Sequence, residues 1–331
     1  MTNSILVKVP LRISLLGGGT DFLSYYKKST GRVLSFAINK YIYILIKELN
    51  DYFDENYRLN YFVTERVNSI NEISNDITRE SLSLQQYKNK LYISTIADIP
   101  QSSGLGSSSS FAVGLNLALR AIQGKKIDKN LVVRDAIDVE LLRLKKPIGI
   151  QDQIAAGYGG INYIEFSTNY KDHYKVNSID SRDFIKELTN NSLLVWTGKH
   201  RSADKILSDQ EKNKDINFES LKSLSDLTEE YVKKNLSKFK LEDLANAMNE
   251  SWEIKKRLSK MISDNNFDRI YNLALKSGAI GGKLLGAGGG GFFLFIVKKS
   301  EQKKFKNSME DYKIENFSIS FEGAQIINKN F

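Results

Sequence analysis

In the stretch Pro100-Gln-Ser-Ser-Gly-Leu-Gly-Ser-Ser-Ser-Ser-Phe111, a glycine-containing turn leads into four serines and then into a helical pattern. Beyond the serines, apolar residues recur at steps of four and three, at Phe111, Leu115, Ala118 and Ile122. This is the spacing of an amphipathic helix, so the serines are predicted to form its first turn. The first turn of a helix carries unpaired N–H groups and the positive end of the helix dipole, which attract anions.

The glycines and serines of this loop suit a phosphate group. Gly104 and Gly106 let a bulky ligand approach the backbone closely, and serine hydroxyls bond phosphate oxygens or a magnesium ion. The loop is not a Walker A motif, because no Gly-Lys-Ser/Thr sequence follows the second glycine. Two interpretations stay open at this point: a phosphate-binding loop, or an ordinary helix cap in a solvated turn.

Composition is that of an ordinary globular protein and excludes several kinds of site. The chain has 331 residues, 41% hydrophobic and 26% charged, which is long enough for two domains. It contains no cysteine and only two histidines, His173 and His200, so disulfides, cysteine nucleophiles and histidine-rich metal sites are excluded. The sequence shows neither a signal peptide nor an apolar run of membrane-spanning length. We therefore expect a cytoplasmic protein with no membrane partner.

The formal net charge of +9 is spread along the chain. Lys and Arg are interleaved with acidic residues and form no basic tail, which is not the pattern of a nucleic-acid-binding surface. We expect no nucleic-acid partner, while the overall positive field favours anionic substrates.

The apolar patterns predict an α+β fold. In the first half, strands are expected at residues 5–16, 33–47, 57–63, 90–97 and 161–166, and a second helix at 129–145. In the second half, strands are expected at 192–197, 292–297 and 314–321, and helices at 217–237, 241–263, 267–277 and 301–312. Because composition turns polar at residues 180–189, we predict two domains, residues 1–185 and 186–331.

Two more glycine clusters adjoin predicted strands. Gly17-Gly-Gly-Thr-Asp21 ends the first strand, and it forms either a second group of exposed N–H donors or a simple tight turn. Gly281-Gly-Lys-Leu-Leu-Gly-Ala-Gly-Gly-Gly-Gly291 runs into a buried strand. Four consecutive glycines carry a large entropic cost, which is explained if another chain segment or a phosphate approaches this backbone closely.

Two acidic residues stand in unusual settings. Glu140 lies on the apolar stripe of the helix predicted at 129–145, so it either flanks that stripe at the surface or meets a cation. Asp152 lies between two glutamines in Gly149-Ile-Gln-Asp-Gln153. It is either a helix cap or a general base in a closed pocket.

The three glycine stretches resemble, in order and spacing, the three motifs of the GHMP kinase superfamily, which includes galactokinase, homoserine kinase, mevalonate kinase and phosphomevalonate kinase. They lie at residues 10–21, 100–110 and 283–292, and the resemblance covers essentially the whole chain. It implies an N-terminal half like domain 2 of ribosomal protein S5 and a ferredoxin-like α/β C-terminal half. It also implies an enzyme that transfers phosphate from ATP to an alcohol group, with Mg²⁺ as cofactor.

The resemblance assigns roles to particular residues. The ATP phosphates would lie against the loop residues Gly104, Leu105, Gly106, Ser107, Ser108 and Ser109. Ser108 and Glu140 would hold Mg²⁺. Asp152 would face the acceptor hydroxyl and accept or orient its proton, and Arg12 would be the cation beside that aspartate. Phosphoryl transfer depends mainly on such positioning and charge stabilisation.

Within the superfamily, Gly-Gly-Gly-Thr-Asp, Gln-Asp-Gln and Thr197-Gly198 with Arg201-Ser202 resemble the D-glycero-D-manno-heptose 7-phosphate kinases. Those enzymes phosphorylate the anomeric (C1) hydroxyl and yield the 1,7-bisphosphate used to make nucleotide-activated heptose for surface polysaccharide. The implied substrate-binding residues are Gly17, Gly18, Gly19, Thr20, Asp21, Gln151, Arg201, Ser202, Gly288 and Gly289. Arg201 is the first candidate for the sugar's own phosphate, with Lys40 and Lys283 behind it.

One departure from the galactokinases bears on the substrate. Where those enzymes carry Glu-His, this chain has Gly18-Gly19, which leaves room for a seven-carbon sugar. L-fucose kinases share the Gly-Gly-Gly-Thr-Asp signature, so an L-fucose or other sugar 1-kinase is the alternative. A non-catalytic RNA-binding protein on this scaffold is disfavoured, because the chain retains the four residues that carry the chemistry, Arg12, Ser108, Glu140 and Asp152. A homodimer stays open.

Overall fold

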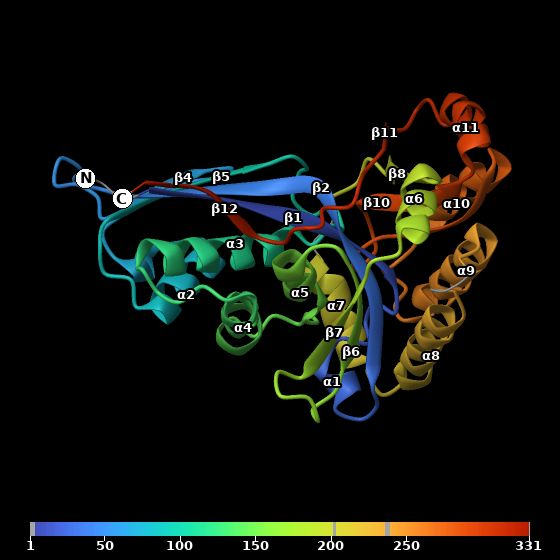
Figure 1. Cartoon of the computed structure of the whole chain (residues 1–331), viewed down its shortest axis with the longest axis horizontal. Coiled ribbons are helices and arrows are strands. Elements are labelled where there is room, and N and C mark those ends of the chain that lie inside the picture. Colours follow the sequence, from blue (N-terminus) through green and yellow to red (C-terminus); the bar gives the residue numbers. More distant parts are fainter. Residues whose placement is uncertain (1–3, 201–202, 236–238, 331) are drawn as a thin grey trace.

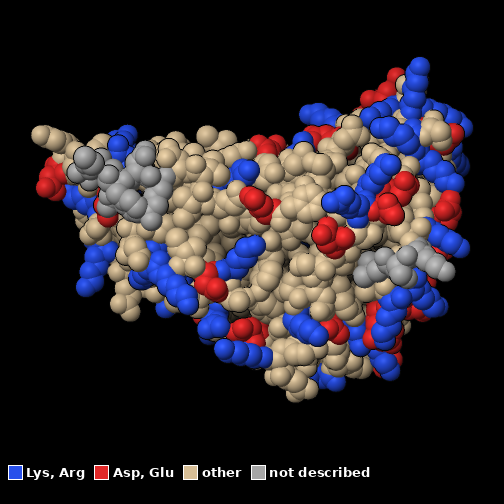
Figure 2. All heavy atoms as spheres, viewed as in Figure 1, with Lys and Arg blue, Asp and Glu red and all other residues tan. Residues whose placement is uncertain are grey.

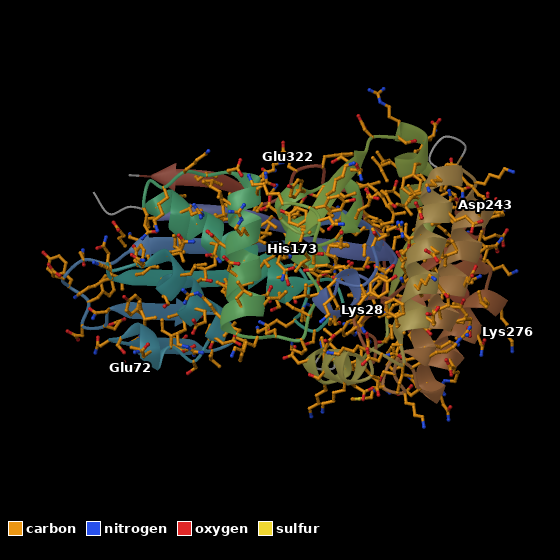
Figure 3. All side chains as sticks on the ribbon, turned by 90° about the horizontal axis from the view of Figure 1, so that it is seen from below. Lys28, Glu72, His173, Asp243, Lys276 and Glu322 are labelled. Atoms are coloured by element: carbon orange, nitrogen blue, oxygen red, sulfur yellow. The ribbon has the colours of Figure 1, made fainter. Side chains whose placement is uncertain are left out.

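The computed structural model describes residues 4–200, 203–235 and 239–330. Two sheets organise the chain, an eight-stranded mixed sheet and a four-stranded antiparallel sheet. In Figure 1 the large sheet lies along the upper edge with helices α2, α3, α4 and α5 below it, and the C-terminal helices gather at the opposite end of the molecule. Figure 3, which views the molecule from below, shows the helices of the N-terminal half in front of the large sheet.

Two long antiparallel strands form the spine of the large sheet. Alternate residues of β1 (Ser4–Leu16) are fully buried from Ile5 to Leu15, as the period-two pattern predicts. Strand β2 (Gly31–Glu48) pairs with β1 along nearly its whole length. The two ends of β2 have different second partners, β6 (Ile161–Phe166) at one end and β5 (Leu91–Ala97) at the other. This spine carries the first glycine motif to the centre of the molecule.

Shorter strands complete the large sheet. Strand β3 (Tyr57–Asn60) runs parallel to β5 and pairs with β4 (Thr64–Val67), and β7 (Tyr174–Ile179) pairs with β6. Strand β12 (Gln325–Asn330) returns from the end of the chain to pair with β1, and Figure 1 shows it running beside that strand. The C-terminal strand therefore belongs to the sheet that the N-terminus begins.

Helices α3 (Ser107–Ile122) and α5 (Gln151–Tyr158) pack on β1 and β2 of the large sheet. The other helical elements of this half are α1 (Leu23–Tyr26), η1 (Ile70–Glu72), α2 (Asp76–Gln85), α4 (Lys129–Ile137) and the π-helical turn η2 (Asp138–Arg143). The first residue of α3 is Ser107, as its periodicity predicts, and its apolar residues pack in one core with those of β1 and β2. Buried apolar area of this kind is the main stabilising term for such a layer.

The second half builds its own sheet and helical layer. The sheet order is β11 (Ile314–Glu315), β8 (Ser192–Trp196), β10 (Phe292–Val297) and β9 (Ala279–Leu284), all antiparallel. The helices are α6 (Arg182–Asn190), α7 (Ala203–Lys212), α8 (Phe218–Asn235), α9 (Leu241–Arg257), α10 (Asn265–Lys276), η3 (Lys299–Glu301) and α11 (Gln302–Ser308). On the face drawn in Figure 2, basic and acidic side chains alternate over this half without forming separate patches.

The predicted α+β class is confirmed, and several element boundaries were wrong. The helix expected at 129–145 changes to a π-helical turn after Ile137, and the strand expected at 314–321 is only Ile314–Glu315. The polar segment 180–189 contains α6, so the predicted division between residues 185 and 186 falls inside a helix; that two-domain division stays a prediction. Within the described residues, no helix is long and apolar enough to cross a membrane.

Candidate active site

A cavity of about 520 Å³ lies where the three glycine stretches meet. Elements from both halves of the chain form its walls: the end of β1, the start of α3, η2, the start of α5, and α7, α9 and β9. Of the residues predicted from sequence to form the site, those lining it are Arg12, Gly18, Gly19, Asp21, Gly104, Gly106, Ser107, Ser108, Ser109, Glu140, Gln151, Asp152 and Lys283. The tertiary fold thus brings together residues from five separate stretches.

The serine loop presents its hydroxyls and backbone to this cavity. Gly106 has φ +76° and caps α3, and Ser107, Ser108 and Ser109 line the cavity from the first turn. The hydroxyl of Ser110 instead donates to the Pro10 carbonyl at 3.0 Å and is fully buried. Three serines are therefore available to a ligand, and the fourth ties the helix to β1.

The third glycine motif supports the serine loop from behind. A Cβ on Gly286 would lie 2.7 Å from the Cα of Gly104, and one on Gly291 would lie 2.2 Å from the Ser103 carbonyl oxygen. The Phe292 N–H also donates to that Ser103 carbonyl at 3.1 Å. Of the two explanations for the glycine run, close approach of another chain segment is the one observed here.

Some predicted site residues do not line the cavity. Leu105 points into the core, Gly17 packs on the Arg32 carbonyl, and the Gly289 N–H donates to Ile262. Thr20 is fully buried, and its hydroxyl bonds the backbone of Gly17 and Arg32. Gly288, which packs on Ile262, does not line the cavity either. Arg201 and Ser202, which were also predicted for the site, lie outside the described residues. Thr20 and these glycines shape the loops that carry the site.

Arg12 and Asp152 form a two-pronged ion pair at the centre of the cavity. The Nε and Nη2 atoms of Arg12 lie 2.5 Å from Oδ1 and Oδ2 of Asp152. The remaining Nη1 donates to the Gly104 carbonyl at 2.7 Å, so the guanidinium also touches the serine loop. Asp152 lies in the first turn of α5. The pair places a carboxylate and a cation beside the loop, and the fork geometry fixes the orientation of the carboxylate.

Glu140 is fully buried yet lines the cavity. Its carboxylate accepts hydrogen bonds from the Ser108 hydroxyl at 2.9 Å and from the Gln153 amide at 2.6 Å. Burial raises the pKa of Glu140, and these hydrogen bonds and Lys146 oppose that rise. The π-helical turn η2 carries Glu140 inward; such turns are common at functional sites. The surface alternative for Glu140 is therefore wrong.

Asp21 joins the first glycine motif to the start of α5. It is 2% exposed, and its carboxylate accepts from the Gly19 N–H at 3.0 Å, the Gln151 N–H at 3.2 Å and the Gln151 amide at 2.9 Å. Burial, and then the charge of Asp152, raise the pKa of Asp21 to about 6. These contacts lock the first glycine motif against the start of α5.

The cavity wall near Asp21 contains two polar atoms that have no hydrogen-bond partner among the described residues. Among the described residues, Ser14 Oγ and Gln151 Oε1 are buried without a hydrogen-bond partner, and both residues line the cavity. Buried polar atoms in native proteins are normally paired. A Cβ on Gly18 would lie 3.0 Å from Ser14 Oγ and 3.6 Å from the Gln151 amide nitrogen. The wall therefore offers hydrogen-bonding groups to a polar ligand.

Two buried lysines complete the lining. Lys255 (8% exposed) donates to the carbonyls of Leu284 at 3.0 Å and Gly286 at 2.5 Å, and Lys283 (3% exposed) donates to the Leu15 carbonyl at 2.9 Å. Both line the cavity. The third lysine of interest, Lys40, pairs with Glu315 and does not line it. Of the two lysines predicted for the substrate phosphate, only Lys283 is at the site.

Sequence reasoning missed Ser14 and Lys255. Ser14 has the polar position in an alternating strand, which gives no signal of function. Lys255 did carry a signal, because it lies at helical spacing with Leu244, Met248 and Ser251 on the buried side of α9. A charged residue on an apolar stripe needs a partner, and this argument applies to Lys255 as it does to Glu140.

The cavity combines an anion-binding helix start, a buried carboxylate beside a serine hydroxyl, and a carboxylate–guanidinium pair. This combination defines a phosphate-transferring enzyme. Family models described as GHMP kinases N terminal domain and GHMP kinases C terminal match residues 68–160 and 232–314. The chain belongs to the GHMP kinase family and is an ATP-dependent kinase.

Three relatives place the chain more closely. A D-glycero-alpha-D-manno-heptose 7-phosphate kinase of Campylobacter jejuni is 30% identical, over 97% of this chain and 98% of that protein. A bifunctional fucokinase/GDP-fucose pyrophosphorylase of Arabidopsis thaliana is 28% identical over 69% of this chain and 22% of that protein. The crystal structure of a D-glycero-D-manno-heptose 1-phosphate kinase from Bacteroides thetaiotaomicron shares the fold, with a TM-score of 0.78, 24% identity and 98% of each chain covered.

Proposed function

We propose that this kinase transfers the terminal phosphate of ATP to the anomeric (C1) hydroxyl of D-glycero-D-manno-heptose 7-phosphate. The observation that carries the proposal is the Arg12–Asp152 pair, which faces a cavity whose other walls suit a nucleotide and a polar sugar. The full-length similarity to a heptose 7-phosphate kinase supports this substrate. The shorter match to a fucokinase favours L-fucose or another sugar as the second candidate.

In this proposal the serine loop binds the ATP phosphates. The N–H groups of the first turn of α3 and the hydroxyls of Ser107, Ser108 and Ser109 face the cavity, and both bind phosphate oxygens. The position of the Arg12 guanidinium, which bonds the Gly104 carbonyl, puts a cation at the end of this loop. There it balances negative charge on the group being transferred.

Ser108 and Glu140 would hold the magnesium ion. A hydroxyl and a buried carboxylate in contact are the hard oxygen donors that Mg²⁺ prefers. In the described parts of the chain, no group of three or more His, Cys, Asp or Glu residues could hold a metal, so the phosphates and water would complete the shell, as is usual for Mg²⁺. When bound, the ion neutralises phosphate charge and orients the nucleotide.

Asp152 would receive or orient the proton of the acceptor hydroxyl. Arg12 bonds both the Asp152 carboxylate and the Gly104 carbonyl of the serine loop. An acceptor hydroxyl bound next to this carboxylate would therefore lie close to the phosphate that is transferred. Arg12 holds both carboxylate oxygens and so keeps the carboxylate in one orientation during turnover.

The sugar would lie against the first glycine motif. Ser14 Oγ and Gln151 Oε1 lack partners within the described structure and would bond sugar hydroxyls. Gly18 leaves open the space next to both residues. We expect Gly18→Glu to fill that space and raise KM for the heptose phosphate about tenfold or more, whereas unchanged kinetics would contradict this placement.

A substrate panel tests the proposal as a whole. ATP consumption is measured with heptose 7-phosphate, L-fucose, galactose and mevalonate, and phosphorus NMR of the product identifies the oxygen that carries the new phosphate. We expect turnover to be fastest with the heptose phosphate and the product to be a C1 phosphate. Faster turnover of L-fucose would favour the second candidate, and a phosphate at any other oxygen would overturn the anomeric assignment.

A further inference from the structure

Lys255 and Lys283 are two buried lysines of the cavity wall. Both ammonium groups bond backbone carbonyls, and within the described chain neither forms an ion pair with a carboxylate. Burial lowers the pKa of both lysines; it lowers that of Lys283 to about 7, with Arg12 adding to the effect. The two lysines lie near each other, because the charge of Lys283 also lowers the pKa of Lys255. A bound anion would favour the charged form of both.

Such an arrangement is costly unless an anion joins it. Taking an ammonium group out of water costs several kcal/mol, which a carbonyl dipole offsets only in part. The other cations of the lining have carboxylate partners: Arg12 pairs with Asp152, and Lys146 pairs with Asp76. Within the described residues, Lys255 and Lys283 are therefore the lysines of the lining that no carboxylate neutralises.

We propose that Lys255 and Lys283 form a second phosphate-binding subsite, which takes the phosphate that the acceptor sugar already carries. This inference rests on the proposed function for the identity of the acceptor. The subsite lies on α9 and β9 of the C-terminal half, whereas the serine loop that suits ATP begins α3. Ser251, one helical turn before Lys255, also lines the cavity and adds a hydroxyl donor.

Lys199, a neighbour of the sequence candidate Arg201, lies away from this subsite. It pairs with Asp264 at 3.1 Å and does not line the cavity. Lys255 and Lys283 are buried in the cavity wall, and within the described residues neither forms an ion pair with a carboxylate. A dianionic phosphate matches two ammonium groups in charge and accepts hydrogen bonds from both.

The first test measures binding without turnover. The serine loop of the full chain is filled with saturating ADP and Mg²⁺, and inorganic phosphate is titrated by calorimetry. We expect one phosphate to bind, and Lys255→Gln or Lys283→Gln to weaken it about tenfold or more. Glutamine still donates to a carbonyl, so the change removes mainly charge. Failure of the unmodified protein to bind phosphate would overturn the subsite.

Lys256→Gln is the matched control. Lys256 is the next residue of α9, but its ammonium group pairs with Glu253 at 2.8 Å and lies over the Trp252 ring, and it does not line the cavity. The control removes the same charge from the same helix, so we expect phosphate to bind it as it binds the unmodified protein. Equal loss in both variants would show a general charge effect and overturn the assignment.

The second test compares KM for two acceptors, heptose 7-phosphate and the same sugar without its phosphate. We expect Lys255→Gln to raise KM for the first about 10- to 100-fold more than for the second. An equal rise for both, or a lowered kcat with no change in either KM, would assign the lysines to the transferred phosphate and overturn the proposal. If the unmodified kinase binds phosphate through these lysines but turns over no sugar phosphate, the proposed substrate fails while the subsite stands.

Discussion

Asp21 offers a test in which the structure predicts both sign and size. Its pKa in the folded protein is about 6, against an ordinary value of 3.8. The folded state thus favours the protonated form of Asp21. The free energy of unfolding therefore falls as pH rises between these two values, and it stays at the lower value at higher pH. At about 1.4 kcal/mol for each pH unit by which the two pKa values differ, the loss is about 3 kcal/mol.

Asp21→Asn removes this titration. The substitution also disturbs the three hydrogen bonds that the carboxylate accepts, but that cost is the same at every pH. The free energy of unfolding is measured by urea denaturation of the ligand-free protein and the variant at pH 4, 5, 6, 7 and 8. We expect the stability of the variant, relative to the unmodified protein, to rise by about 2 kcal/mol from pH 4 to pH 7, because part of the loss occurs below pH 4.

Asp215→Asn is the control for Asp21→Asn. The Asp215 carboxylate is exposed and pairs with Lys28 at 2.8 Å, which lowers its pKa; Lys28 is labelled in Figure 3. A lowered pKa gives the opposite sign, since the unmodified protein gains stability as pH rises. If the difference between Asp21→Asn and the unmodified protein does not vary with pH, the argument that burial dominates the environment of Asp21 is refuted.

The remaining predictions concern chemistry and packing. Asp152→Asn should lower kcat about 100-fold or more while ATP binding, measured by calorimetry, stays intact; near-normal turnover would end its assignment as base or orienting group. Glu140→Gln should raise the Mg²⁺ concentration for half-maximal activity about tenfold or more, because it removes the charge beside Ser108, and an unchanged magnesium dependence in a folded variant would contradict the metal site. Gly291→Ala should destabilise the protein by about 3 kcal/mol or more in urea denaturation, since φ is +92° and the new Cβ would lie 2.2 Å from a carbonyl oxygen. Gly124→Ala, at φ +65° with nothing within 4 Å of the Cβ, isolates the backbone strain, and an equal effect there would refute the packing argument.

Most of the candidate site could be predicted because its motifs are local. The serine run before an amphipathic helix, the Gln-Asp-Gln segment and the glycine clusters are each contiguous, and backbone conformation depends mainly on neighbouring residues. The apolar stripe left Glu140 either at the surface or beside a cation, and only the resemblance to the GHMP kinases placed it in the site. The partners of these residues lie at long sequence separations, and contiguous patterns do not specify them.

The sequence alone determined the α+β class and the start of α3 at Ser107. Its resemblance to the GHMP kinases predicted that Arg12, Ser108, Glu140 and Asp152 belong to one site. Only the tertiary structure decided which of the glycines and polar residues face the cavity. The Thr20 hydroxyl bonds the backbone of Gly17, and the third glycine motif packs against the serine loop. Lys255 lines the cavity. The physical reason is that local periodicity records which side of an element is buried. The segment that packs against that side is set by contacts between residues far apart in the sequence. In this protein those contacts decide whether a residue lines the cavity or packs in the interior.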